Sequence, residues 1–252
     1  ESRDAYAHAY WQLRQRKGIT LYDAQRRMRE RNYFAAMMLN QGDADAMISG
    51  LSRNYPDTIR PAIQIIGTEE GVSKIAGMYI MLTKKGPMFL ADTTVNFNPT
   101  AEELADITLL VAKEVKSLGI EPRIAMLSYS NFGSSPGPDS EKMAQAVAYL
   151  HENHPTLHVD GEIQANFALN SDLLLEKFPF SRLVGSEVNT LIFPNLSSGN
   201  IAYKLLQQMT DSDAIGPVLI GLKKSIHVVQ LGASVREIIN MVKVAVIDAQ
   251  NK

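Results

Sequence analysis

The stretch PRIAMLSYSNFGSSPG, residues 122–137, carries the strongest indication of the fold. Its first half, Arg123 to Ser128, is largely apolar and predicts a buried strand, and the hydroxyl-rich second half predicts a loop. A helical pattern then runs from about Asp139 to Asn153. A strand that passes through a polar loop into a helix is the repeating unit of α/β folds.

The same alternation extends outward from this stretch in both directions. A hairpin is expected from residues 72–81 and 88–91, joined by a turn at residues 84–87. The other expected strands are residues 45–50, 157–159, 191–193, 218–222 and 226–230. The other expected helices are residues 2–17, a segment after Thr20, a segment through Arg60 and Ile66, residues 99–119, a segment from about Ser198, and residues 234–250.

Alternation of this kind predicts parallel strands with helices on both faces of a sheet. In such sheets, ligands bind beyond the carboxyl ends of the strands. We therefore expect any chemistry to lie in the loops that follow Gly50, Ser128, Phe193 and Leu222.

The composition of the 252 residues argues against several classes of protein. The chain has no cysteine, which excludes disulfides, a cysteine nucleophile and thiolate metal sites, and agrees with a reducing cytoplasm. Its net charge of -2 gives no general attraction to nucleic acid or anionic lipid. No apolar stretch approaches the roughly 20 residues of a membrane span. We therefore expect a cytoplasmic protein that binds neither nucleic acid nor membrane.

Two motifs are better explained without chemistry. The G-x-S-x-G pattern from Gly133 to Gly137 resembles a hydrolase nucleophile elbow, but Pro136 lacks the backbone N–H that such an oxyanion hole uses. His151 and His154 are spaced for a metal on one helix face. No carboxylate at ligand spacing completes a metal set, and cationic side chains are common at the C-terminus of a helix.

Four arginines in the second expected helix could form a nucleic-acid patch. They are Arg26, Arg27, Arg29 and Arg31. A solvated helix face is the preferred interpretation, because Asp23 and Glu30 interleave with them and no aromatic platform accompanies them.

Four segments have residues suited to binding an anion. The loop from Ser128 to Ser134 offers hydroxyls and free backbone N–H groups, and the turn from Pro194 to Tyr203 has the same capacity. Arg14 and Arg60 can each place a guanidinium fork on phosphate oxygens. Taken singly, each segment is equally explained as a loop, a helix cap or a surface ion pair.

Six segments along nearly the whole chain resemble the phosphotransacetylase family. They are Tyr10–Arg14 with Lys17-Gly18, Gly42–Gly50, Thr58–Ile66, Pro122–Ser128, Asp160–Gln164 and Gly199–Lys204. The resemblance implies a two-lobed, three-layer α/β/α fold of the isocitrate/isopropylmalate dehydrogenase type, with a ligand cleft between the lobes and dimerisation. The chain begins at Glu1 without an initiator Met, so we expect the family's opening elements to be missing.

Glycines and turn residues cluster near two junctions, at Gly71 and Leu222. We therefore expect one lobe to comprise residues 1–71 and 222–252. The second lobe is expected to comprise residues 72–221.

The family transfers an acetyl group between phosphate and the thiol of coenzyme A. The reaction needs a base near the thiol and a cation for the charge that develops on the acyl oxygen and phosphate. The resemblance assigns these roles to a Ser-Arg-Gly segment with an aspartate after it, and to two arginines that match Arg14 and Arg60. In this chain the segment reads Gln230-Leu231-Gly232, and the matching acid is Glu237.

That departure predicts binding without turnover. Leu231 carries no charge, and losing one such electrostatic contact costs about a hundredfold to a thousandfold in rate. If turnover persists, Arg60 and Glu237 are the catalytic candidates. The ligand-binding residues implied by the resemblance are Arg14, Arg60, Ser128, Ser130, Gly133, Ser134, Asn200, Lys204, His227, Gln230 and Glu237.

Two segments, residues 54–61 and 227–235, resemble the carboxyl-terminal domain of the large bacterial malic enzymes. The resemblance implies a domain that follows an N-terminal malate-decarboxylating domain of the same polypeptide and binds acetyl-CoA or CoA as an inhibitor. NADP and a divalent metal would then belong to that absent domain. No metal site and no covalently bound cofactor are expected in this chain.

Three functions therefore remain open. The preferred one is an allosteric domain that binds acetyl-CoA or phosphate and supports a homodimer or higher oligomer, because the phosphate-binding segments are kept beside an altered reaction centre. The second is an active phosphate acetyltransferase that uses Glu237 as its base. The third is a purely structural oligomerisation domain.

Overall fold

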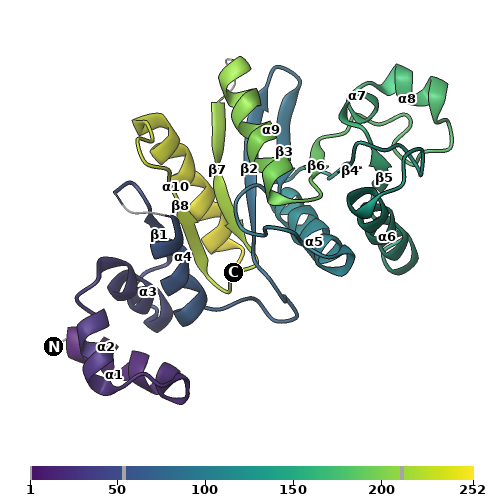
Figure 1. The fold of residues 1–252 in the computed structure, drawn as a ribbon. Helices are drawn as coiled ribbons and strands as arrows, with labels where there is room; N and C mark the ends of the chain where they lie inside the picture. Colours follow the sequence, from purple (N-terminus) through teal and green to yellow (C-terminus); the bar gives the residue numbers. More distant parts are fainter. Residues whose placement is uncertain (1, 53–54, 211–212) are drawn as a thin grey trace. The chain divides into compact units, whose positions relative to one another are not determined.

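The computed structural model describes residues 2–52, 55–210 and 213–252, and the chain divides into two compact units. Unit 1 comprises Glu1–Gly71 and Gly221–Lys252, and unit 2 comprises Val72–Ile220. Both units combine strands with packed helices, so the chain has a mixed α/β fold (Figure 1).

Unit 1 is built around a short parallel sheet. Strand β1 (Ala46–Ser49) pairs in parallel with β8 (Ser225–Val228), and helix α10 (Val235–Gln250) packs against both. The other helices of this unit are α1 (Ser2–Arg14), the 3-10 helix η1 (Gln15–Lys17), α2 (Leu21–Arg27), α3 (Arg31–Gln41) and α4 (Tyr55–Ile65).

Local residue choices explain where the first helices end and begin. Gly18 closes η1 in the left-handed conformation (φ 82°), which glycine adopts without a Cβ clash. Thr20 and Asp23 form a capping box that starts α2. The prediction of a helix ending near Lys17 is therefore confirmed. The prediction of one helix through Arg31 is wrong, because the chain turns after Arg27 and starts α3 anew.

The described part of unit 2 contains a sheet with the strand order β5-β4-β6-β3-β2-β7. Its strands are β2 (Ala76–Thr83), β3 (Gly86–Ala91), β4 (Ile124–Leu127), β5 (Val159–Ile163), β6 (Thr190–Ile192) and β7 (Asp213–Ile220). Strands β3, β6, β4 and β5 run parallel, whereas β2 is antiparallel to both β3 and β7. The sheet is therefore mixed, because the tight turn after Thr83 reverses the chain.

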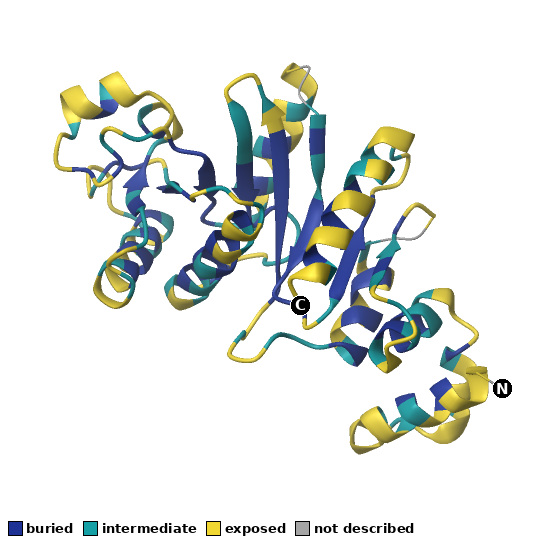
Figure 2. Ribbon diagram, turned by 180° about the vertical axis from the view of Figure 1, so that it is seen from behind, coloured by how far each residue is buried: buried dark blue, intermediate teal, exposed yellow. Residues whose placement is uncertain are grey.

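Helices flank this sheet and enclose its apolar side chains. They are α5 (Ala101–Ser117), α6 (Pro138–Asn153), α7 (Ala165–Ala168), α8 (Ser171–Lys177) and α9 (Leu196–Met209). Figure 2 shows the strands largely buried and the outer faces of the helices exposed. Tyr203 of α9 stacks on Tyr79 of β2 with ring centroids 4.0 Å apart, which anchors α9 to the sheet.

One strand of unit 2 lies later in the chain than predicted. The expected strand at residues 157–159 is displaced, because β5 begins at Val159 and continues to Ile163. Asp160 and Glu162 interrupt the apolar pattern of this strand, although both side chains are buried. The short helices α7 and α8 were not predicted either.

Candidate functional site

Polar loops follow the carboxyl ends of the parallel strands in unit 2. After β3, Asp92 is buried and accepts hydrogen bonds from the backbone N–H groups of Thr94 (2.8 Å), Val95 (3.0 Å) and Asn96 (2.9 Å). Burial raises the pKa of Asp92, and these hydrogen bonds act in the opposite direction. The buried Asp92 carboxyl therefore holds the backbone of this loop in its conformation.

Glu162 of β5 organises the loop that follows β4. Its Oε1 accepts a hydrogen bond from Ser130 Oγ (2.8 Å) and another from the Gly133 N–H (2.6 Å), and its backbone oxygen accepts one from the Phe132 N–H (2.8 Å). Phe132 has a positive φ of 49°, which is uncommon for a bulky residue. A buried carboxyl therefore holds a strained loop in one conformation.

The prediction of free backbone N–H groups in the loop from Ser128 to Ser134 is wrong for residues 130–134. Each of these groups already donates a hydrogen bond inside unit 2, because serine hydroxyls, the Glu162 carboxyl and backbone oxygens lie close enough to accept them. Ser134 Oγ, for example, accepts from the Asn131 N–H at 2.9 Å. In this conformation the N–H groups of residues 130–134 are occupied, so side-chain donors would have to supply most of the contacts to an anion.

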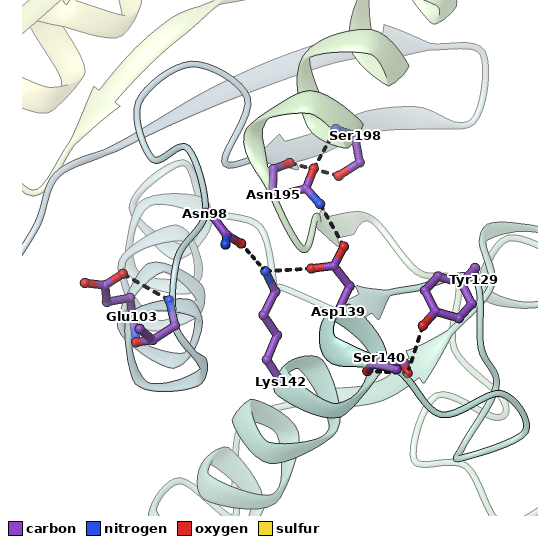
Figure 3. A network of polar contacts seen from close by, with 10 residues as sticks. Asn98, Glu103, Tyr129, Asp139, Ser140, Lys142, Asn195 and Ser198 are labelled. Atoms are coloured by element: carbon purple, nitrogen blue, oxygen red, sulfur yellow. Dashed lines mark hydrogen bonds and ion pairs between the residues drawn. The ribbon is translucent and has the colours of Figure 1, made fainter.

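A network of polar side chains ties two of these loops to helix α6 (Figure 3). Lys142 Nζ of α6 donates to Asn98 Oδ1 (2.6 Å) and pairs with Asp139 Oδ1 (2.8 Å). Asn195 Nδ2 donates to Asp139 Oδ2 (3.0 Å), and Asn195 also caps helix α9 through the Ser198 N–H. The loops after β3 and β6 are thereby fixed to the start of α6.

Asn200 lies in the first half of α9, and Lys204 lies one turn further along the same helix. Asn200 Nδ2 donates to the backbone oxygen of Thr93 (3.0 Å), and Lys204 Nζ lies 5.9 Å from the Tyr203 ring centroid. The close approach depends on Gly199, because a Cβ atom there would lie 2.4 Å from the Asp92 backbone oxygen. Asn200 and the predicted ligand residues between Ser128 and Ser134 thus lie in or against loops at the carboxyl ends of strands, whereas Lys204 lies further along α9.

Unit 1 contains a cavity of about 230 Å³ beside Arg60. Its lining combines three arginines, two acids and a tyrosine: Arg27, Glu30, Arg31, Asn32, Tyr33, Asp57, Arg60 and Pro61. Arg27 pairs with Glu30 at 2.8 Å. The preferred interpretation of Arg27 and Arg31 as part of a solvated helix face did not predict their position beside Arg60.

Arg14 lies at the end of α1, next to a pair of tyrosines. Its Nε is buried and has no hydrogen-bond partner among the described residues. Tyr10 and Tyr33 make an edge-to-face contact (5.6 Å), and Tyr33 Oη donates to Gln64 Oε1 (2.8 Å). Burial and Tyr33 raise the pKa of Tyr10, while the charges of Arg14 and Arg27 act to lower it.

A second cavity of unit 1, of about 470 Å³, opens at the carboxyl ends of β1 and β8. Its lining is mostly apolar or small: Arg31, Asn32, Ala35, Met47, Ile48, Ser49, Gly50, Leu51, Ser52, Val229, Ile238 and Val242. Val229 and Ile238 bracket the segment from Gln230 to Glu237. Gly50 approaches that segment so closely that a Cβ atom would lie 2.2 Å from the Val229 backbone oxygen.

The altered segment itself contains an exposed apolar side chain and a helix cap. Leu231 is 64% exposed. Glu237 Oε2 accepts from the Ser234 N–H (2.6 Å), and the Glu237 N–H donates to Ser234 Oγ (3.2 Å), which forms the capping box of α10. His227 is fully buried. Its Nε2 lies 3.1 Å from Ser225 Oγ and 3.0 Å from Asp248 Oδ2.

The predicted site residues fall into two groups. Unit 1 carries Arg14, Arg60, His227, Gln230 and Glu237, and unit 2 carries Ser128, Ser130, Gly133, Ser134, Asn200 and Lys204. Their convergence on one ligand remains a prediction. Among the described residues, no cluster of three or more histidines and carboxylates is placed to hold a metal ion.

The sequence pattern of phosphate acetyl/butaryl transferases matches residues 1–246. The chain belongs to this family. Its fold matches a phosphotransacetylase from Streptococcus pyogenes with a TM-score of 0.93 and 37% identity, over 99% of this chain and 76% of that one. A membrane-crossing helix, long and apolar enough to span the bilayer, was not found in the described part of the chain.

The chain is similar to relatives of two kinds, NADP-dependent malic enzymes and phosphate acetyltransferases. An NADP-dependent malic enzyme of Haemophilus influenzae is 43% identical over 96% of this chain, which spans 32% of that protein. A phosphate acetyltransferase of Clostridium acetobutylicum is 38% identical over 98% of this chain, which spans 76% of that protein. The chain is thus a phosphotransacetylase-like domain, homologous to both, and it covers only about a third of the malic enzyme.

Proposed function

We propose that this chain binds acetyl-CoA and phosphate as a regulatory domain of an NADP-dependent malic enzyme and does not turn them over. The observation that carries this proposal is Leu231, an exposed hydrocarbon side chain where the family chemistry requires an arginine. Arg14 and Arg60, which match the family's two other arginines, are retained.

The two cavities of unit 1 support binding of such a ligand. Coenzyme A joins phosphate groups to a long, less polar arm that ends in the acyl thioester. Guanidinium groups bind phosphate through paired hydrogen bonds, so the cavity of Arg27, Arg31 and Arg60 suits the phosphates. The larger cavity, with Met47 and Val242 in its lining, suits the arm.

The altered segment disfavours turnover for two reasons. Leu231 cannot stabilise negative charge on a developing oxyanion, which removes about a hundredfold to a thousandfold of rate. Glu237 is already engaged as the cap of α10, so its carboxyl would have to leave Ser234 before it could accept a thiol proton.

Regulation under this proposal is a linkage effect. Acetyl-CoA that binds one conformation of the intact protein more tightly than another shifts their populations, by no more than the difference between the two affinities. NADP and a divalent metal belong under this proposal to the malate-decarboxylating part of the polypeptide. We also propose that identical copies of the protein associate into a homodimer or a higher oligomer, because most soluble oligomers are built from identical chains.

Calorimetric titration of the intact protein with acetyl-CoA tests this function, together with malate decarboxylation measured with and without acetyl-CoA. We expect saturable binding and a change in the decarboxylation rate. Phosphate-dependent release of coenzyme A from acetyl-CoA is expected to stay at background. Absence of binding at millimolar acetyl-CoA would remove the proposal.

A second candidate is an active phosphate acetyltransferase. The similarity to the Clostridium acetobutylicum acetyltransferase along nearly the whole chain favours it equally. A phosphate oxygen would attack the thioester carbonyl, the C–S bond would break, and the coenzyme A thiolate would leave and take up a proton. Arg60 would stabilise the charge. This candidate predicts phosphate-dependent release of coenzyme A that is lost in Arg60→Ala. Absence of such release from the unmodified protein would exclude the candidate.

A further inference from the structure

Arg31 lies where the two cavities of unit 1 meet. Among the described residues, Arg31 and Asn32 are the ones that line both the arginine cavity and the apolar cavity. Asn32 is already committed: its Nδ2 donates to the Asp57 backbone oxygen (3.2 Å), and its Oδ1 accepts from Ser49 Oγ (2.8 Å). Arg31 is therefore the polar side chain at this junction that is left for a ligand.

The charge of Arg31 is not neutralised by a neighbour in the described part of the chain. Arg27 pairs with Glu30, whereas the Arg31 guanidinium takes part in none of the ion pairs formed by described residues. Arg31 is exposed, and its guanidinium at the edge of the mostly apolar cavity is free to form paired hydrogen bonds with an anionic ligand.

The position of Arg31 in its helix is unfavourable for local stability. Arg31 is the first residue of α3, and Glu30 at the N-cap makes no side-chain capping hydrogen bond. The helix dipole places partial positive charge at this end, so a cation there is disfavoured and an acidic residue is preferred. Helix stability therefore gives no reason for an arginine at this position.

We propose that Arg31 is a specificity-determining residue of this site, which binds phosphate oxygens of the ligand at the junction of the two cavities. This inference rests on the proposed binding of acetyl-CoA and phosphate. Arg31 then supplies a positive charge beside the segment in which Leu231 carries none, because Val229 and Ile238, which bracket that segment, line the same cavity. The charge serves to hold the anion and does not restore the lost arginine.

The test is calorimetric titration of the intact protein with acetyl-CoA and, separately, with inorganic phosphate. We expect Arg31→Gln to weaken acetyl-CoA binding about tenfold or more, because hydrogen bonds to a charged group are lost. Arg31→Lys is expected to recover part of the loss, since it keeps the charge but not the fork. Arg29→Gln is the matched control, because Arg29 is exposed and lines neither cavity.

The variants separate failure of this inference from failure of the proposed function. If Arg60→Gln weakens binding and Arg31→Gln does not, the role of Arg31 is wrong and the binding function stands. If the unmodified protein binds neither compound, the binding function fails and the inference fails with it. If Arg31→Gln weakens binding of both compounds, Arg31 binds inorganic phosphate. If it weakens binding of acetyl-CoA alone, Arg31 binds the phosphate groups of coenzyme A.

A purely structural role for Arg31 would appear as a lower melting temperature. We expect Arg31→Gln to melt at the same temperature as the unmodified protein or slightly above it, because a cation leaves the positive end of α3. A fall in melting temperature that Arg31→Lys does not reverse, accompanied by equal losses for both compounds, would overturn the inference.

Discussion

His227 Nε2 lies 3.0 Å from Asp248 Oδ2 in the interior of unit 1, where strand β8 meets helix α10. Ser225 Oγ lies 3.1 Å from the same nitrogen and donates a hydrogen bond to the Ala245 backbone oxygen (3.0 Å). Both contacts use Nε2, and Nδ1 has no partner among the described residues. A Ser-His-Asp relay needs both ring nitrogens, so this buried cluster is a structural tie between β8 and α10.

Replacement of Asp248 by Asn is expected to destabilise the fold by about 3 kcal/mol, because one partner of a buried charged cluster is removed. Lys252 Nζ, which lies 2.9 and 3.1 Å from the two carboxyl oxygens, would lose its charged partner and keep at most one of these contacts. Denaturant unfolding at pH 7 measures the change. Asp172→Asn in the exposed start of α8 is the control and is expected to change stability by less than about 0.5 kcal/mol.

The stability that Asp248 contributes is expected to disappear in acid. Burial opposes ionisation, but the hydrogen bond from His227 and the charge of Lys252 outweigh it, and the pKa of Asp248 is lowered. A carboxyl with a lowered pKa in the folded state stabilises the fold above its unfolded pKa of about 3.9, and the contribution is lost as the pH falls through the folded value. Unfolding of the unmodified protein and of Asp248→Asn should therefore converge below about pH 4. A constant difference between them would contradict this.

Glu162→Gln is expected to loosen the loop after β4 and to cost about 1–2 kcal/mol of stability, because two hydrogen bonds to its carboxyl are weakened. Amide hydrogen exchange should accelerate at Gly133, which donates to Glu162 Oε1. Glu152→Gln on the exposed face of α6 is the control. Unchanged exchange at Gly133 would show that other contacts hold the loop.

Helix ends were predictable from sequence where a single residue decides them. Gly18 and Thr20 place helix boundaries with local chemistry alone, and the structure confirms them. Within the predicted helix of residues 99–119, the structure adds a capping box of Thr100 and Glu103 at the start of α5. Strand β5 was misplaced because Asp160 is buried by long-range partners: its Oδ2 accepts from Ser181 Oγ and the Arg182 N–H, both at 2.8 Å. Such contacts between distant segments leave no periodic signal in the chain.

The candidate site was predictable only in part for the same reason. The family resemblance selected Arg60, but the approach of Arg27 and Arg31 to it depends on how α2, α3 and α4 pack. The hydroxyls of residues 128–134 were found by composition, yet composition could not show that they satisfy the loop's own N–H groups. The sequence shows which polar side chains follow a strand. Only the packing of the folded chain shows which of them have no hydrogen-bond partner within the protein and can bind a ligand.

Gly199→Ala is expected to destabilise unit 2 by about 1–3 kcal/mol, because the added methyl group would press on the Asp92 backbone oxygen and force α9 outward. The expected displacement would also weaken the hydrogen bond from Asn200 to Thr93. Thermal unfolding provides the measurement, and Ser197→Ala on the exposed side of the same turn serves as the control. Equal stability of both variants would mean that α9 shifts at no cost.

Introducing the residues that the family resemblance implies at Gln230 and Leu231 is the most direct test of whether this segment prevents turnover. Gln230→Ser combined with Leu231→Arg places a hydroxyl and a cation where acyl transfer requires them, while Arg60 and the Glu237 carboxyl remain in place. We expect phosphate-dependent release of coenzyme A from acetyl-CoA to rise by about a hundredfold or more over the unmodified protein. Val235→Arg adds the same charge at another exposed position nearby and is expected to stay at background. If the unmodified protein already turns over as fast as the double variant, the leucine does not silence this site.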